Sequence, residues 1–86
     1  MTAITKIPDQ FIETDVDDET VIVGLTSGEF FSLKDSGLAV WKLIDGNRSE
    51  ADIILKLSEN FDGQRPTIEA DVSAFLAQLR AAHFIR

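Results

Sequence analysis

The stretch LTSGEFFSLKDSGLAVWKLIDG, residues 25–46, contains the point at which the hydrophobic period of the chain changes. Before it, residues 11–33 are rich in β-branched and aromatic side chains that alternate along short runs, as strands do. After it, residues 36–82 repeat apolar side chains at spacings of three and four, the period of an amphipathic helix. The sequence therefore predicts an α+β domain in which a small sheet precedes a group of helices.

Three short strands are expected in the N-terminal part of the chain. They cover residues 11–16, 20–26 and 29–33. The acidic run Asp17-Asp18-Glu19 suits a solvated turn, and Gly28 permits the positive φ that a tight turn at Thr26-Ser27-Gly28 needs. Short connections make the three strands antiparallel neighbours in chain order.

Three helices are expected after the strands. The first spans about residues 36–45 and ends at Gly46, the second follows a capping box at 49–52 and runs to Phe61, and the third spans about 67–82 after a loop at 62–66. Asp35 or Ser36 is the expected cap of the first helix, and Thr67 that of the third. Trp41 lies in a largely apolar helix, which predicts a core position. Together with the sheet, this layout is winged-helix-like.

Composition restricts the class of protein. Its 86 residues fit a single domain, residues 1–86, and 44% of them are hydrophobic, enough for a core. The net charge is −7 and the eight Lys and Arg residues are scattered, so neither nucleic acid nor an anionic membrane is an expected partner. No signal peptide and no apolar run near the ~18 residues of a membrane span are found, and no cysteine is present, which suits a cytoplasmic protein.

The residues that could support catalysis or metal binding are few. His83 is the single histidine, and its place after the third helix suits a role in helix capping and packing. The acidic cluster at 15–19 lacks the glycine and the terminal glutamate of a calcium loop. No phosphate-binding loop, nucleophile elbow or Walker pattern is present. The chain is therefore not expected to be an enzyme, and no cofactor or metal is expected.

The third strand carries apolar groups on both faces. Phe30 and Ser32 point one way, while Phe31 and Leu33 point the other. One pair must face the helices, and nothing inside the strand blocks pairing with a further strand. Two arrangements remain open: the third helix covers this edge, or it lies beside the edge and forms a groove for an extended peptide.

The order and spacing of several segments resemble the PqqD family of leader-peptide recognition proteins. The segments are TSGEFFSLKDSGLAVWKLIDG, the stripe IILKL, EADVSAFLAQL and the terminal apolar pair, so the resemblance covers about residues 12–85. The resemblance implies a winged-helix-like fold of three strands and three helices, and a non-catalytic function. In this family the leader of a ribosomally made precursor adds as a strand beside the third strand, against the third helix, and the complex delivers the precursor to a modifying enzyme.

Carried over by position, the resemblance implies a peptide-binding site. Its residues are Glu29, Phe30, Phe31, Ser32, Leu33 and Lys34 on the strand, and Asp71, Val72, Phe75, Gln78 and Leu79 on the helix. The implied partners are a precursor leader peptide and a peptide-modifying enzyme such as a radical enzyme, a leader protease or a cyclase. The chain departs from the family at Lys34, where an Asn is frequent, and at Ala82-His83, where many members have a glycine.

Two other functions remain as alternatives. A DNA-binding winged-helix regulator fits the fold, but its recognition helix would need exposed basic residues at successive positions. A homodimer that pairs its own edge strands fits the open third strand. The sequence does not name the peptide product, which could belong to quinone cofactor, lasso peptide or thioether peptide biosynthesis.

Overall fold

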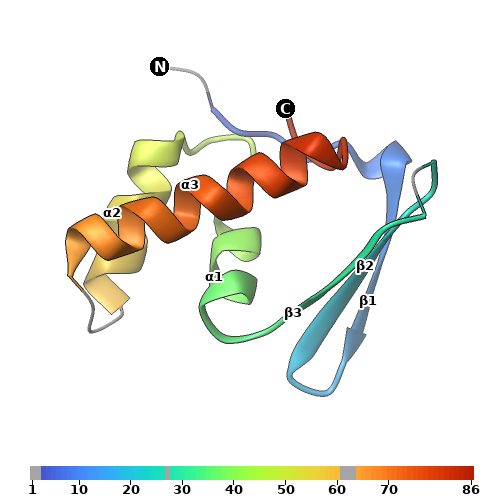
Figure 1. Ribbon diagram of the computed structural model, residues 1–86, viewed down its shortest axis with the longest axis horizontal. Helices are drawn as coiled ribbons and strands as arrows, with labels where there is room; N and C mark the ends of the chain where they lie inside the picture. The colour runs from blue at the N-terminus through green and yellow to red at the C-terminus, as the bar shows by residue number, and fades with distance from the viewer. Residues whose placement is uncertain (1–2, 27, 61–63) are drawn as a thin grey trace.

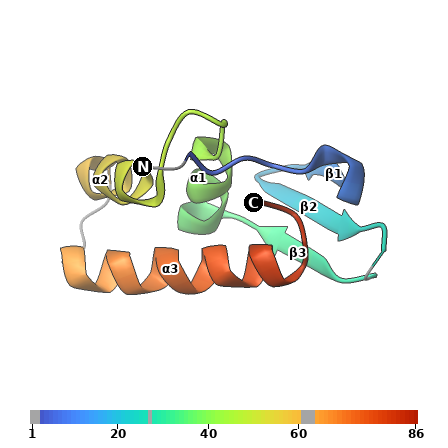
Figure 2. The same ribbon diagram turned by 90° about the horizontal axis from the view of Figure 1, so that it is seen from above.

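The computed structural model describes residues 3–26, 28–60 and 64–86. In chain order its elements are a 3-10 turn η1 (Pro8–Gln10), strands β1 (Phe11–Val16), β2 (Glu19–Gly24) and β3 (Phe30–Leu33), and helices α1 (Asp35–Leu43), α2 (Glu50–Asn60) and α3 (Arg65–Ala81). The sheet occupies one end of the molecule, α2 lies at the other, and α3 runs the length between them (Figures 1 and 2). The predicted α+β class, with an antiparallel three-stranded sheet before three helices, is confirmed.

The sheet has the order β1-β2-β3 and both pairings are antiparallel. Its inner face is buried under the helices and carries Phe11, Thr20, Ile22 and Leu33. Leu33 is buried and Phe31 is half-buried against the core, whereas Phe30 and Ser32 are exposed. Phe31 and Leu33 are therefore the pair of β3 that faces the helices.

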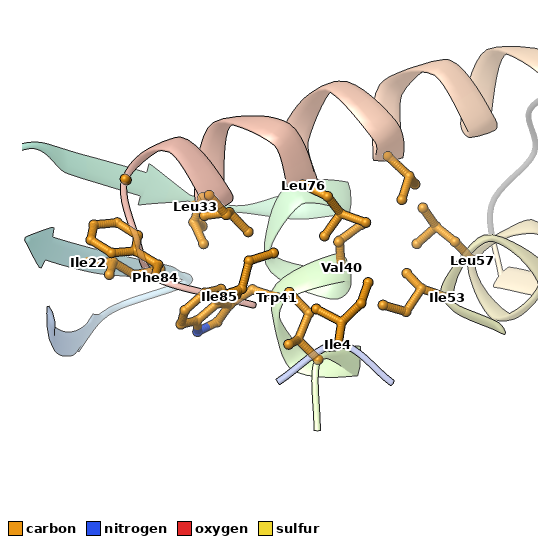
Figure 3. Packing of buried hydrophobic residues seen from close by; sticks show 14 of the residues in the cluster. Ile4, Ile22, Leu33, Val40, Trp41, Ile53, Leu57, Leu76, Phe84 and Ile85 are labelled. Atoms are coloured by element: carbon orange, nitrogen blue, oxygen red, sulfur yellow. The ribbon is translucent and has the colours of Figure 1, made fainter. Parts of the chain in front are cut away.

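A single cluster of buried side chains joins the sheet to the helices (Figure 3). Trp41 is 1% exposed, which confirms its predicted core position, and its ring contacts Phe11 edge-on at 5.3 Å between centroids. Phe84 is fully buried, and the centroid of its ring lies 5.5 Å from that of Phe11 and 5.4 Å from that of Phe31. Burying each such aromatic side chain contributes about 1.5–3 kcal/mol to stability, so these rings hold the sheet against α1 and the C-terminal segment.

The two ends of the chain are tied together. Thr5 and Arg86 exchange backbone hydrogen bonds of 3.0 and 2.9 Å, and Lys6 forms an antiparallel bridge with Ile85. The ammonium of Lys6 lies 4.3 Å from the centre of the Trp41 ring. Burial lowers the pKa of Lys6 below 10.5, although the charges of Glu13 and Asp45 oppose this shift.

Helix α3 ends in a Schellman motif that contains a histidine in place of the usual glycine. The N–H of His83 donates to the carbonyl of Arg80 (3.0 Å), and the N–H of Phe84 donates to that of Leu79 (2.9 Å). His83 has φ 65°, the left-handed region that favours glycine. This motif turns the chain back so that Phe84 enters the core.

Local signals at the helix ends were partly right. The capping box before α2 is confirmed, because Ser49 N–H donates to the Asp52 carboxylate (3.0 Å) and Asp52 N–H to Ser49 Oγ (3.3 Å). Gly28 has the positive φ, 74°, that the turn before β3 requires; Gly46 has φ 83° but does not end the first helix, because α1 already ends at Leu43 with an extended C-cap at Ile44. Four positions named in these predictions lie outside the described residues: Ser27 of the turn, Phe61 at the end of the second helix, and residues 62–63 of the loop after it.

The predicted caps of α1 and α3 are wrong. Lys34, not Asp35 or Ser36, occupies the N-cap of α1 and makes no side-chain cap bond, because an ammonium group has no acceptor for a helix N–H; Asp35, the first residue of the helix, has φ 54°. Helix α3 starts at Arg65 with Gln64 at its N-cap, so Arg65 and Pro66 of the predicted loop belong to the helix and Thr67 lies inside it. A proline near the first helical position costs little because its missing N–H has no helical partner there.

Candidate functional site

Among the described residues, no strand pairs with the outer backbone edge of β3. This strand is the last strand of the sheet, and Gly24 N–H donates to the Glu29 carbonyl at 2.7 Å. In an antiparallel pair hydrogen-bonded and non-hydrogen-bonded residue pairs alternate. From the register Ile22↔Phe31 and Val23↔Phe30, the N–H and C=O groups of Phe30 and Ser32 therefore point away from β2. These are the groups to which one more strand could pair.

Helix α3 supplies the side wall next to this edge. Asp71, Phe75 and Gln78 share one stripe of the helix, at spacings of four and three. Asp71 and Gln78 are exposed, and Phe75 is half-buried with part of its ring against the core. The stripe therefore offers an aromatic surface between two polar side chains.

Two hollows lie along this wall. The first has a volume of about 440 Å³ and is lined by Glu29, Phe30, Phe31, Gln78 and Ala81. The second, of about 250 Å³, is lined by Ser36, Gly37, Val40, Leu57, Ile68, Asp71, Val72 and Phe75. Because the α3 stripe borders both hollows, they form the two ends of one surface that runs from the start of β3, along α3, to the first turn of α1.

The predicted site residues differ in their position and in their burial. Eight of them border the open edge or the hollows: Glu29, Phe30, Phe31, Ser32, Asp71, Val72, Phe75 and Gln78. Leu33, Val72 and Leu79 are 6%, 1% and 0% exposed, so they support the site mainly from within the core. Lys34 is exposed at the far end of β3, where it lies 3.9 Å from a carboxylate oxygen of Glu19.

Sequence reasoning missed several residues that line the hollows. Ile68 and Ala81 continue the α3 stripe by one turn at either end, so helical periodicity from Asp71 and Gln78 could have identified them. Ser36 and Gly37 come from the first turn of α1. No sequence pattern brings them to α3, since that contact depends on how the two helices cross.

The polar groups of the site lie on an exposed surface. Ser32 Oγ donates to Glu19 Oε2 at 3.2 Å on the exposed surface. Within residues 3–26, 28–60 and 64–86, no cluster of three His, Cys, Asp or Glu side chains could hold a metal ion. In the same part of the chain, no helix has the length and hydropathy needed to cross a membrane. The geometry of the site is that of an extended docking surface.

Comparisons with known proteins agree on one family and one fold. A family model described as coenzyme PQQ synthesis protein D (PqqD) matches residues 19–85. The chain is similar to the structure of TbiB1 in complex with the TbiA(beta) leader peptide, with 28% identity, a TM-score of 0.80 and 95% of each chain covered. It shares the fold of lasso peptide synthetase B1 complexed with the leader peptide, at 20% identity, a TM-score of 0.80 and 96% of each chain. No curated protein matches the chain.

Proposed function

The chain belongs to the PqqD family, as its sequence predicts, and from this premise we propose that it is a non-catalytic adaptor that binds a leader peptide. The leader of a ribosomally made precursor would pair with the open edge of β3 as a fourth strand, next to α3. The adaptor would then present the precursor to the enzyme that modifies it. Two structural neighbours, at 28% and 20% identity, are complexes with leader peptides, which supports this proposal.

The observation that carries the proposal is the open edge of β3 beside the two hollows. Backbone pairing with Phe30 and Ser32 gives affinity that depends little on leader sequence. The hollows give selectivity. Leader side chains on one face of the added strand would reach Phe31 and Gln78, and leader residues beyond that strand would reach Phe75. For an interface of this small size we expect a Kd between about micromolar and tens of nanomolar.

A duplex-binding function is disfavoured by charge. Helix α3 carries two basic residues, Arg65 and Arg80, at opposite ends. Arg65 is already paired with Glu69 at 3.4 Å. A helix with this arrangement, in a chain of net charge −7, has no continuous basic face to place against phosphates.

The substitution Phe75→Asp tests the proposed groove. It removes the aromatic surface between the hollows and places a carboxylate where the leader would pack, so leader binding should fall by at least about tenfold. The control is Leu55→Asp on α2, an equally drastic change at a side chain that is 51% exposed and does not line either hollow. Isothermal calorimetry with the synthetic leader of the precursor encoded beside this chain gives both Kd values.

Thermal unfolding of both variants separates lost binding from lost folding. If Phe75→Asp folds and binds the leader with unchanged affinity, the groove beside α3 is not the site. If the unmodified chain does not bind that leader at all, the adaptor function itself is wrong.

A further inference from the structure

The outer face of the sheet is apolar although no described helix covers it. Ile12, Val23 and Phe30 are paired in register across the three strands and form one row on this face. Their side chains are 55%, 39% and 68% exposed, and Leu25, beyond the end of β2, is 56% exposed. The helices gather on the other side of the sheet (Figure 1). A monomeric protein rarely keeps a contiguous apolar patch of this kind without a partner.

Acidic side chains border this apolar row. Asp17 and Asp18 form the exposed β1–β2 turn at one end of the sheet, and Glu19, which follows them, lies on the outer face, where its carboxylate accepts a hydrogen bond of 3.2 Å from Ser32 Oγ. Lys34 is the basic residue at the end of β3, and it lies beside the carboxylate of Glu19. At this end of the face three carboxylates outnumber one ammonium group, so the border here is negative, in keeping with the net charge of −7.

The charge of this border decides which partner fits. A second copy of the chain would bring two negative borders together around the apolar row, and like charges facing each other across an interface are unfavourable. A different protein with an apolar centre and a border of Lys and Arg would gain both the burial and the charge attraction.

The position of the face relative to β3 indicates which protein this is. Phe30 belongs to the apolar row and also lines the hollow beside α3. A fourth strand paired to β3 would extend the sheet, and every second side chain of that strand would project onto the outer face next to Phe30. A protein docked on this face would therefore contact the bound leader directly.

We propose that the outer face of the sheet, centred on Ile12, Val23 and Phe30, is the surface on which the peptide-modifying enzyme docks, through an apolar patch bordered by Lys and Arg. This inference rests on the proposed leader-binding function. It assigns the two surfaces of β3 separate tasks: its edge holds the leader, and its outer face holds the enzyme.

The substitution Ile12→Lys tests this assignment. Ile12 lies on β1, two strands away from the open edge, so the change places a charge at the far end of the apolar row without touching the groove. The control is Leu55→Lys, which introduces the same charge at a comparably exposed leucine on α2. The assay uses a precursor peptide that the unmodified chain binds and the enzyme that modifies it, and measures precursor turnover as the concentration of the adaptor is raised.

We expect Ile12→Lys to raise the adaptor concentration for half-maximal turnover by about tenfold or more, while the Kd for the synthetic leader stays within about twofold. Leu55→Lys should change neither quantity. Turnover with the unmodified chain should also fall as salt rises, because charge attraction contributes to docking.

Three outcomes contradict the inference. Unchanged turnover with folded Ile12→Lys means that the enzyme docks elsewhere, and the leader-binding function survives if calorimetry still shows binding. A stable dimer that Ile12→Lys dissociates, seen by light scattering, makes a second copy the occupant of the face. If Leu55→Lys lowers turnover as much as Ile12→Lys does, the loss comes from adding a positive charge anywhere on the chain and not from changing the outer face.

Discussion

The substitution Ser32→Pro probes the open edge of β3 at the level of the backbone. The N–H of Ser32 points away from β2, so a proline at this position removes a donor from the free edge and leaves the ladder to β2 intact. Phe31, the residue before it, already has the extended backbone that a following proline requires. The change is therefore aimed at the added strand and not at the fold.

The magnitude follows from the hydrogen bond that is lost. A leader carbonyl that paired with Ser32 N–H would be left without its donor inside the interface. Leaving one such group unsatisfied costs about 1–3 kcal/mol, which corresponds to a rise in Kd of about 5- to 150-fold. The proline ring also occupies space on the side where the leader would lie, so the upper half of this range is expected.

Two controls isolate the backbone effect. Ser32→Ala removes the hydroxyl that donates to Glu19 and keeps the N–H, so it should bind the leader nearly as well as the unmodified chain. Glu13→Pro places a proline on the outer edge of β1. Because Leu25 N–H donates to the Gln10 carbonyl, hydrogen-bonded and non-hydrogen-bonded pairs alternate so that the N–H of Glu13 points away from β2. This variant reports the cost of a proline in an edge strand that has no groove beside it.

Calorimetry with the synthetic leader, together with a thermal unfolding curve for each variant, provides the comparison. The reasoning is refuted if folded Ser32→Pro binds within about twofold of Ser32→Ala, since no strand would then be added at this edge. It is also refuted if Glu13→Pro weakens binding by the same factor, because the effect would then not be specific to β3.

Two further predictions concern stability. His83→Gly should raise the free energy of unfolding by about 0.5–1 kcal/mol, because glycine adopts the φ of 65° without a Cβ clash. This gain corresponds to a rise in Tm of about 2–8 °C for a domain of this size. An unchanged or lower Tm would contradict the prediction. The lowered pKa of Lys6 means that, between that pKa and 10.5, the unfolded chain binds more protons, so stability should rise with pH in this window. Urea unfolding at pH 8 and pH 10 should show a smaller rise in Lys6→Met, and an equal rise would assign the effect to other groups.

The sequence predicted the elements of the fold because each has a strong local signal. The change of hydrophobic period near residue 35 separated sheet from helices, and the Ser49–Asp52 capping box marked the start of α2. The start of α3 was misplaced because Pro66 was read as loop, although a proline is tolerated in a first helical turn. Local signals therefore predicted which elements form and in what order, but predicted the first residue of a helix less well.

The candidate site could be predicted as a segment but not as a surface. Alternation along β3 separated Phe30 and Ser32 from Phe31 and Leu33, yet it could not say which pair faces the helices. That choice depends on pairing with β2, where Ile22 lies opposite Phe31 and is fully buried. The hollow at the first turn of α1 likewise depends on how α1 and α3 cross, which no local pattern encodes.

The same alternation connects the core, the groove and the outer face. Successive side chains of a strand point to opposite faces of the sheet. Because Phe31 and Leu33 point into the core, Phe30 and Ser32 must point outward. The register makes these two exposed residues the ones whose backbone groups also face the open edge. A protein that needed only a stable sheet would place charged residues or a proline there. A phenylalanine that is 68% exposed on an unblocked edge adds an aggregation risk without adding to the core, and binding of partners at the edge and at the outer face would explain why this chain carries it.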